Sequence, residues 1–198
     1  MFEFLNRANL CGTAVTEPQF SNEVPDRRFY KFTLAIQRKS GYVDNIIIMA
    51  DEKTLQDLLP LKGQRLAITG SVRTYNEKTE TESHVRVFVF ADRIEQTAAA
   101  DENRIELRGF LTKEAIVRQT PLGKIVCDYI LATQRNPYRR DYLPCIAWGS
   151  VAERVGTFPE KTEIVAMGRI QSRIYTKTIE DETVEMVAYE VSVNRIYT

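Results

Sequence analysis

The feature that most constrains this chain is an internal repeat in which matching residues stand 97 positions apart. Asn6-Arg7-x-x-Leu10-x-Gly12 returns as Asn103-Arg104-x-x-Leu107-x-Gly109, and Leu34-Ala35-x-Gln37-Arg38 returns as Leu131-Ala132-x-Gln134-Arg135. A repeat as long as a small domain indicates that one fold is built twice along the chain.

We therefore predict two tandem domains, residues 1–96 and 103–198, joined by a short linker at 97–102. The linker is rich in small residues, as connecting segments that do not fold by themselves usually are. Beyond the middle of each copy the offset grows to 98, so that Gly70 matches Gly168, and the extra residues of the second copy fall in its loops.

Each copy has the pattern of five strands and one short helix. Apolar residues recur at every second position of residues 30–36, which is typical of a half-buried strand. The helix follows the third strand; we expect Asp51 to be its N-cap in the first copy, and Ser150 to open a capping box with Glu153 in the second. The predicted strands are residues 6–14, 30–36, 45–50, 65–75 and 85–93, and in the second copy 104–118, 127–133, 142–148, 163–175 and 184–196.

Five strands with a helix between the third and fourth, in about 95 residues, are typical of the five-stranded Greek-key barrel known as the OB fold. We therefore predict a mainly all-β chain of two tandem OB barrels. In the fourth strand of the second copy, Arg169, Gln171, Arg173 and Tyr175 share one face, while Ile174 belongs to the face that suits a core. A strand face with cations and a ring suits an unpaired nucleic acid, because cations contact phosphates and rings stack on bases.

The second copy also resembles the bacterial single-stranded DNA-binding protein family, whose members are OB folds. The resemblance rests on the order and spacing of short motifs and spans Asn103 to Ile196; the first copy keeps only the beginning of the pattern. The motifs are Asn103-Arg104-Ile105-Glu106-Leu107-Arg108-Gly109, Thr120-Pro121-x-Gly123, Leu131-Ala132, Ala147-Trp148-Gly149 and Gly168-Arg169-Ile170-Gln171-Ser172-Arg173.

The resemblance implies that aromatic side chains of the second copy stack on bases. Carried over position by position, the family's rings fall on Tyr142, Trp148 and Tyr175, and Tyr138 lies in the loop where another family ring is common. We expect polar and cationic side chains along the same track to contact the strand and its phosphates. These are Arg135, Arg139, Arg140, Arg169, Gln171 and Arg173, with Lys124 and Lys177 extending the track.

The first copy departs from the family pattern at the ring positions. It has Asn45, Asp51 and Glu77 where the second copy has rings, although Tyr42 and Tyr75 lie nearby in the sequence and could substitute in part. We therefore expect the second copy to dominate nucleic-acid binding, and the first to contact DNA or a sister subunit.

From these residues we predict a protein that binds single-stranded DNA tightly and without sequence specificity, and protects it in replication, recombination or repair. Stacking and phosphate contacts ignore base identity, and they weaken as salt rises. The family assembles four OB domains, which implies a homodimer of this two-domain chain, with replication or repair proteins as further partners. The chain stops at Tyr197-Thr198, so we expect it to lack the family's acidic C-terminal tail.

Other interpretations of the same residues remain open at this stage. The apolar neighbours of Trp148 also fit a core tryptophan, and Arg169 and Arg173 could pair with Glu163 or Glu185 across the sheet. At the level of function, the alternative is a primosome-type OB accessory protein that mainly bridges protein partners and binds DNA or RNA weakly. An OB domain for structured RNA is a third candidate.

Composition argues against other classes of protein. The net charge is zero, so nucleic-acid binding must come from a local patch. The cysteines (Cys11, Cys127 and Cys145) are widely spaced and fit buried reduced thiols better than a disulfide framework or a zinc site. His84 is the sole histidine, so we expect no catalytic site, no metal and no cofactor. No segment looks like a signal peptide or a membrane span, which favours a cytoplasmic, nucleoid-associated location.

Overall fold

Strands make up most of the described chain, which comprises residues 4–78, 83–179 and 182–198 of a computed structural model. The all-β prediction is confirmed. The first half contains β1 (Asn6–Ala14), β2 (Gln19–Val24), β3 (Arg27–Gln37), β4 (Val43–Asp51), α1 (Glu52–Leu55), β5 (Arg65–Lys78) and β6 (Ser83–Gln96). The second half contains β7 (Glu102–Leu111), β8 (Ile116–Gln119), β9 (Ile125–Asn136), β10 (Arg139–Trp148), α2 (Ser150–Val155), β11 (Glu163–Ile179) and β12 (Glu182–Tyr197).

Each half closes into a five-stranded barrel with the same connectivity. In the first, the strands pair in the order β1–β3–β4–β6–β5 and back to β1. In the second, β7–β9–β10–β12–β11 close in the same way. Only the pairs β4–β6 and β10–β12 are parallel, as expected when the third and fifth strands of a Greek-key barrel meet. The prediction of two OB barrels is confirmed.

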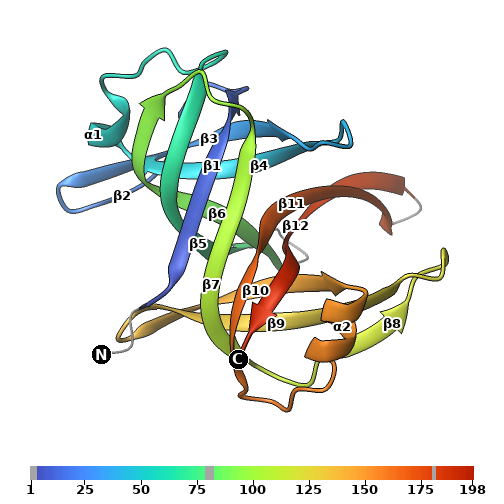
Figure 1. The fold of residues 1–198 in the computed structure, drawn as a ribbon. Helices are drawn as coiled ribbons and strands as arrows, with labels where there is room; N and C mark the ends of the chain where they lie inside the picture. Colours follow the sequence, from blue (N-terminus) through green and yellow to red (C-terminus); the bar gives the residue numbers. More distant parts are fainter. Residues whose placement is uncertain (1–3, 79–82, 180–181) are drawn as a thin grey trace.

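The two barrels share one sheet because β1 and β7 pair with each other (Figure 1). This pairing is antiparallel and places Ala8 opposite Ile105, two residues that hold the same position in the repeat. Asn6 lies opposite Leu107, and Leu10 lies opposite Asn103. The register therefore relates the barrels by an approximate two-fold axis through the centre of β1 and β7.

The repeated asparagines perform the same task in both barrels. Asn6 exchanges two hydrogen bonds with the backbone of Val72, of 2.8 and 2.7 Å. Asn103 does the same with Ile170, at 2.7 and 3.0 Å. In each barrel the side chain thus ties the first strand to the fourth, where the backbone groups would otherwise lack a partner.

Repeated glycines allow the strands of each barrel to approach closely. A Cβ atom on Gly168 would lie 2.1 Å from the carbonyl oxygen of Ser192, and one on Gly70 would lie 2.1 Å from that of Phe90. Both glycines stand at shifts in strand register, where the sheet bends to close the barrel. The interiors are filled by aliphatic side chains, among them Leu34, Ile46, Ile48, Leu66, Leu107, Leu131, Leu143 and Ile170.

The structure corrects some of the predicted elements. The strand predicted at 104–118 is interrupted at residues 112–115, so β7 and β8 are separate, and β2 has no predicted counterpart. Asp51 is the N-cap of α1 and accepts a hydrogen bond of 2.9 Å from the backbone N–H of Lys53, as predicted. The capping box is wrong: Gly149 is the N-cap of α2, no side chain caps it, and Ser150 is already helical. None of the described helices is long and apolar enough to cross a membrane.

Candidate nucleic-acid interface

The outer face of β10 carries two exposed rings. Tyr142 and Trp148 alternate with the buried Leu143, Cys145 and Ala147, so their side chains point away from the barrel interior. Tyr142 is 54% exposed and Trp148 is 41% exposed. The interpretation of Trp148 as a core tryptophan is therefore wrong.

The strand register brings the outer face of β11 beside these rings. Ser192 of β12 pairs with Ile146 of β10 on one side and with Arg169 of β11 on the other. Paired residues direct their side chains to the same side of a sheet, so the two rows form one surface about 10 Å apart. We call this surface the stacking face; it comprises Tyr142, Pro144, Ile146 and Trp148 of β10 and Arg169, Gln171, Arg173 and Tyr175 of β11.

The predicted side chains of β11 differ in how free they are. Gln171 is buried and donates a hydrogen bond of 2.6 Å to Glu190. Arg169 is half-buried and its Nε has no hydrogen-bond partner among the described atoms. Burial lowers the pKa of Arg169, and the nearby Arg38 guanidinium lowers it further. Arg173 is exposed and its guanidinium carbon lies 5.6 Å from the ring centre of Tyr175.

Ile174 also departs from the pattern, because it is 60% exposed where a core position was expected. The far part of β11 curves beyond the second barrel and reaches the first barrel at β4 (Figure 1). Alternation still sets which residues share a face, but there is no barrel interior behind this part of the strand. The side chains that were expected to be buried there are therefore exposed.

The second group of predicted residues lies at the turn from β9 to β10 and in the adjoining ends of these two strands. Tyr138 at the tip of the turn is 98% exposed, and Arg139 and Arg140 are exposed as well. Arg135 differs: it forms an ion pair with the buried Asp141, and its Nη2 donates a hydrogen bond of 3.3 Å to the carbonyl oxygen of Thr74 in the first barrel. Arg135 is thus engaged in joining the barrels.

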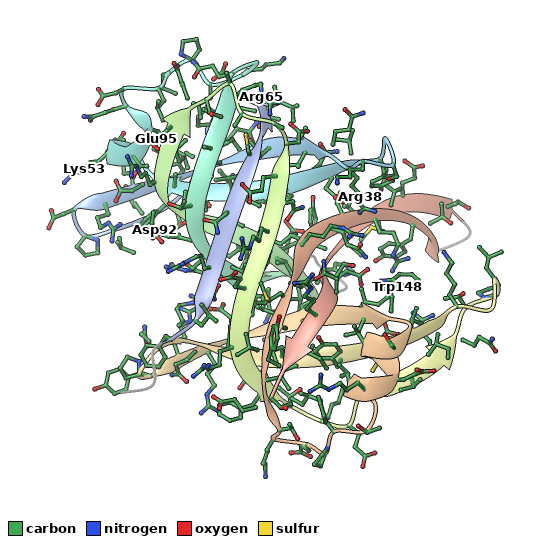
Figure 2. All side chains as sticks on the ribbon, viewed as in Figure 1. Arg38, Lys53, Arg65, Asp92, Glu95 and Trp148 are labelled. Atoms are coloured by element: carbon green, nitrogen blue, oxygen red, sulfur yellow. The ribbon has the colours of Figure 1, made fainter. Side chains whose placement is uncertain are left out.

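Of the two predicted lysines, Lys124 lies at the Trp148 end of the stacking face. It is exposed in the turn between β8 and β9, and the carbonyl oxygen of its neighbour Ile125 accepts a hydrogen bond of 2.9 Å from Gly149. Figure 2 labels Trp148 at this end of the barrel. Lys177 belongs to β11, but its side chain lies outside the described residues.

Three side chains of the first barrel lie at the same surface. Tyr75 and Asn76 line a groove together with Arg139, Arg140 and Tyr142. Close by, the guanidinium carbon of Arg73 lies 3.8 Å from the ring centre of Phe90. Burial lowers the pKa of Arg73, and Arg135 and Arg139 also contribute to the shift. Only Tyr75 carried a sequence signal, because the contact between the halves is not local in sequence.

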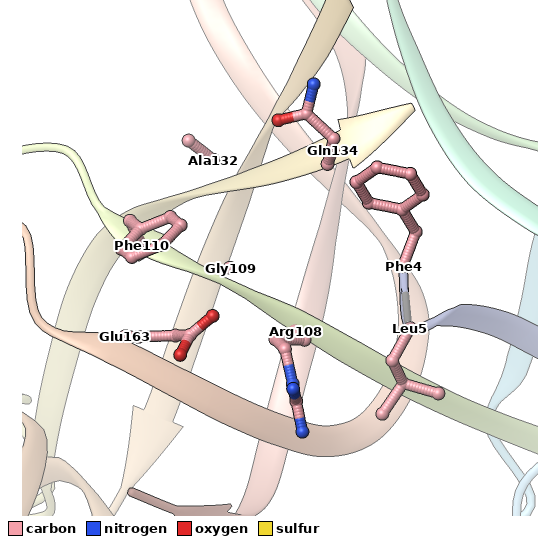
Figure 3. A pocket seen from close by; sticks show the side chains of 8 residues that line it. All are labelled: Phe4, Leu5, Arg108, Gly109, Phe110, Ala132, Gln134 and Glu163. Carbon is pink, nitrogen blue, oxygen red and sulfur yellow. The ribbon is translucent and has the colours of Figure 1, made fainter. Parts of the chain in front are cut away.

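A different hollow lies on the outer face of β7 and β9, where Ala132 and Gln134 pair with Tyr142 and Arg140 of β10 (Figure 3). It has a volume of about 250 Å³ and is largely apolar, with Phe4, Leu5, Phe110 and Ala132 in its wall. Phe4 is 57% exposed and Phe110 is 42% exposed. Arg108 is the sole cation among the residues that line this hollow, whereas three arginines line the groove beside Arg139.

The three cysteines lie in two settings: Cys127 and Cys145 belong to the barrel core, whereas Cys11 lies against the connecting segment at Ala99. Cys11, Cys127 and Cys145 are buried and unpaired, as the sequence predicts. Burial raises the pKa of the Cys127 thiol to about 11 and also raises that of Cys145. The described residues contain no cluster of three or more His, Cys, Asp or Glu side chains that could hold a metal ion.

Comparisons with protein families and with curated proteins both find similarity to single-stranded DNA-binding proteins. The Single-strand binding protein family matches residues 102–197. A "Single-stranded DNA-binding protein 3" of Listeria innocua is 36% identical over 81 residues, covering 37% of this chain and 50% of the relative. "Single-stranded DNA-binding protein A" of Bacillus subtilis is 35% identical over 80 residues, covering 37% of this chain and 46% of the relative. The chain thus spans about half the length of the curated relatives it matches.

Among solved structures, the wild-type single-stranded DNA binding protein from Thermus aquaticus is similar over nearly the whole chain. The TM-score is 0.75 at 20% sequence identity, covering 98% of this chain and 92% of that one. A deletion variant of the same protein gives a TM-score of 0.74 at 21% identity, covering 98% of this chain and 93% of that one. At this identity the similarity concerns the fold, and it includes both barrels.

Proposed function

Because residues 102–197 match the Single-strand binding protein family, we propose that the chain binds single-stranded DNA without sequence specificity. The observation that carries this proposal is the pair of exposed rings, Tyr142 and Trp148, on one strand face beside exposed guanidinium groups. Rings of this kind stack on bases of any identity, whereas a duplex hides the faces of its bases.

The stacking face supplies the attractive contacts in this proposal. Tyr142, Trp148 and Tyr175 stack on bases along the bound strand, and Tyr138 contacts it from the loop tip; each stacked base contributes about 1–3 kcal/mol. The exposed Arg139, Arg140 and Arg173, the half-buried Arg169, and Lys124 and Lys177 contact phosphates.

Arg135 and Gln171 have a supporting role in the proposal. Each already has a carboxylate partner, Asp141 and Glu190 respectively, so each holds the binding surface in shape. Every phosphate contact made by the remaining cations releases counterions from the strand. The logarithm of the affinity should therefore fall with the logarithm of salt concentration, by a slope of about −0.7 for each contact.

The biological setting follows from the same proposal. A protein that covers unpaired strands acts where a duplex is opened, so its roles lie in replication, recombination and repair in the cytoplasm, at the nucleoid. It breaks no bond. The chain supplies two barrels, and a homodimer would supply four; light scattering at micromolar concentration should give twice the mass of 22.8 kDa.

The test is binding of fluorescent oligothymidylate to Tyr142→Ala combined with Tyr175→Ala. Loss of two stacking contacts should weaken binding at least tenfold, since each contributes about 1–3 kcal/mol. The matched control is Tyr197→Ala, which removes a 51%-exposed tyrosine of β12 outside the stacking face and should leave affinity unchanged. Equal affinity of the double variant and the wild type would refute the stacking role.

The competing function is an OB module that mainly bridges protein partners. The apolar hollow around Phe4 and Phe110 is the observation that favours it, because exposed apolar hollows often receive partner side chains. Weak binding of oligothymidylate by the wild type, in the millimolar range, would select this function over the first.

A further inference from the structure

Beyond β1 and β7, two of the contacts between the barrels form junctions that are related by the repeat; a further contact runs from Arg86 of β6 to the carbonyl oxygen of Val187 in β12, at 2.6 Å. At the first junction, Asp44 accepts a hydrogen bond of 3.0 Å from the backbone N–H of Ser172 in β11. At the second, Asp141 accepts one of 2.9 Å from the backbone N–H of Thr74 in β5. Asp44 and Asp141 hold the same position in the repeat, so the two junctions are equivalent contacts.

The first junction is closed by an aromatic side chain. The hydroxyl of Tyr42 donates a hydrogen bond of 3.1 Å to the carbonyl oxygen of Ser172. The guanidinium carbon of Arg38 lies 4.5 Å from the Tyr42 ring centre, and its nitrogens bind Asp44. Figure 2 shows Arg38 where the first barrel approaches the curved part of β11. Tyr42 thus bridges the barrels, although its side chain remains 43% exposed.

The second junction is open. The position that corresponds to Tyr42 is Arg139, whose side chain is exposed. A groove of about 210 Å³ remains between the barrels, and we call it the junction groove. Its lining comes from both barrels: Thr74, Tyr75, Asn76 and Val85 from the first, and Arg135, Arg139, Arg140, Asp141 and Tyr142 from the second.

The charges in the junction groove favour an anion. The buried Asp141 forms an ion pair with Arg135 and accepts a hydrogen bond from Thr74, so its negative charge is already compensated. Among the described residues, Arg140 donates a hydrogen bond only to the neutral Gln134, at 3.2 Å, and Arg139 lines the groove with an exposed side chain. Tyr75 and Tyr142 line the same groove. Guanidinium groups next to rings are what a phosphodiester with an attached base requires.

We propose that the junction groove is the crossing point at which one single strand passes from the stacking face of the second barrel onto the first barrel. Arg139 and Arg140 contact the phosphodiester there, and Tyr75 and Asn76 of the first barrel contact the adjoining nucleotide. This inference rests on the proposed function and extends it, because it gives the first barrel a defined part in binding. At the first junction the corresponding position holds Tyr42, which is hydrogen-bonded to Ser172 and carries no charge for a phosphate, so the path has one crossing and not two.

The test compares one cation at each junction. Arg139→Ala removes an exposed cation at the start of β10, and Lys39→Ala removes one from the corresponding turn of the first barrel, between β3 and β4. Binding of an oligothymidylate of about 20 nucleotides, long enough for two OB barrels, is measured as a function of salt. Arg139→Ala should weaken binding threefold to tenfold and reduce the salt slope by about 0.7, as expected for one lost phosphate contact. Lys39→Ala should change neither; equal losses in both variants would overturn the single crossing.

A second comparison isolates the first barrel. Asn76 is exposed, so Asn76→Ala should leave the fold intact, and thermal unfolding verifies this. It should weaken binding of the oligomer of about 20 nucleotides several-fold and leave unchanged the binding of one of about 8, which the second barrel covers alone. Tyr75→Ala provides an independent variant with the same expectation.

The outcomes separate this inference from the function on which it rests. If the wild type binds both oligomers and neither Asn76→Ala nor Tyr75→Ala weakens binding of the longer one, the crossing is refuted while single-strand binding stands. If the wild type binds neither oligomer, the proposed function itself is refuted, and the crossing with it.

Discussion

The carboxylate of Asp44 in the first barrel accepts a hydrogen bond of 3.0 Å from the backbone N–H of Ser172, 128 residues further along in the second barrel. The second barrel returns the contact through Asp141 and Thr74. Both carboxylates are buried, at 0% and 1% exposure, and each is paired with an arginine of its own barrel. These reciprocal contacts fix the angle between the barrels, and with it the position of the junction groove beside the stacking face.

Removal of the Asp44 carboxylate should destabilise the protein strongly. Asp44→Ala leaves Arg38, whose side chain is 25% exposed, without its partner, and it also leaves the Ser172 N–H unsatisfied. Loss of one member of a buried ion pair costs about 3 kcal/mol or more of unfolding free energy. Denaturation by urea, followed by circular dichroism, measures this loss.

The control for Asp44→Ala is Arg28→Ala. Arg28 and Glu23 form an exposed pair at 3.7 Å, which should contribute about 0–1 kcal/mol. If the two variants lose similar stability, the contact between Asp44 and Ser172 does not hold the barrels together.

A methyl group at position 168 should prevent β11 and β12 from approaching. In Gly168→Ala the new Cβ would lie 2.1 Å from the carbonyl oxygen of Ser192, a backbone atom that cannot move aside cheaply. We expect a loss of about 1–3 kcal/mol in unfolding free energy, the usual result of overpacking. Thr69→Ala, an exposed change beside the corresponding Gly70, should stay within about 0.5 kcal/mol. A Gly168→Ala variant as stable as the wild type would contradict the close approach.

The buried thiols should be unreactive in the folded protein. Cys127 is fully buried and its pKa is raised to about 11, so neither access nor ionisation favours attack at pH 8. Cys11 and Cys145 are buried as well. A disulfide reagent that reports free thiols should therefore detect none of them in the native protein and all of them after unfolding. Rapid native labelling of any of these thiols would contradict their burial.

The same thiol predicts how stability depends on high pH. The unfolded chain ionises Cys127 near the ordinary pKa of about 8.5, while the folded protein keeps its proton up to about pH 11. Between these values the unfolded state gains by losing the proton, so the unfolding free energy falls as pH rises. Cys127→Ala should show a smaller fall than the wild type between about pH 8 and pH 10. Equal slopes would show that Cys127 does not ionise differently in the two states.

Much of the fold could be predicted because its determinants are local or repeated. The alternation of apolar residues predicted the second strand of each barrel. The repeat pairs Asn6 with Asn103, and the two asparagines make the same contact in both barrels. The N-cap at Asp51 could be predicted because the hydrogen bond that its side chain accepts comes from a backbone N–H only two residues away. The break between β7 and β8 was missed because it depends on where β9 ends its pairing with each of them.

The candidate site was harder to predict because partners distant in sequence decide which side chains are free. Arg135 has the sequence context of a loop cation, yet Thr74 and Asp141 engage it. Gln171 follows the polar phase of β11, yet Glu190 of the neighbouring strand holds it in a buried position. Alternation indicates which residues share a face, but it does not indicate what covers that face.

The most direct test of the whole account is the fluorescence of Trp148, the sole tryptophan, during titration with poly(dT). The account predicts strong quenching by the single strand, reversal of that quenching by added salt, and little change with duplex DNA of the same length. Emission that stays constant while poly(dT) binds, or that responds equally to duplex, would contradict stacking of a base on this ring.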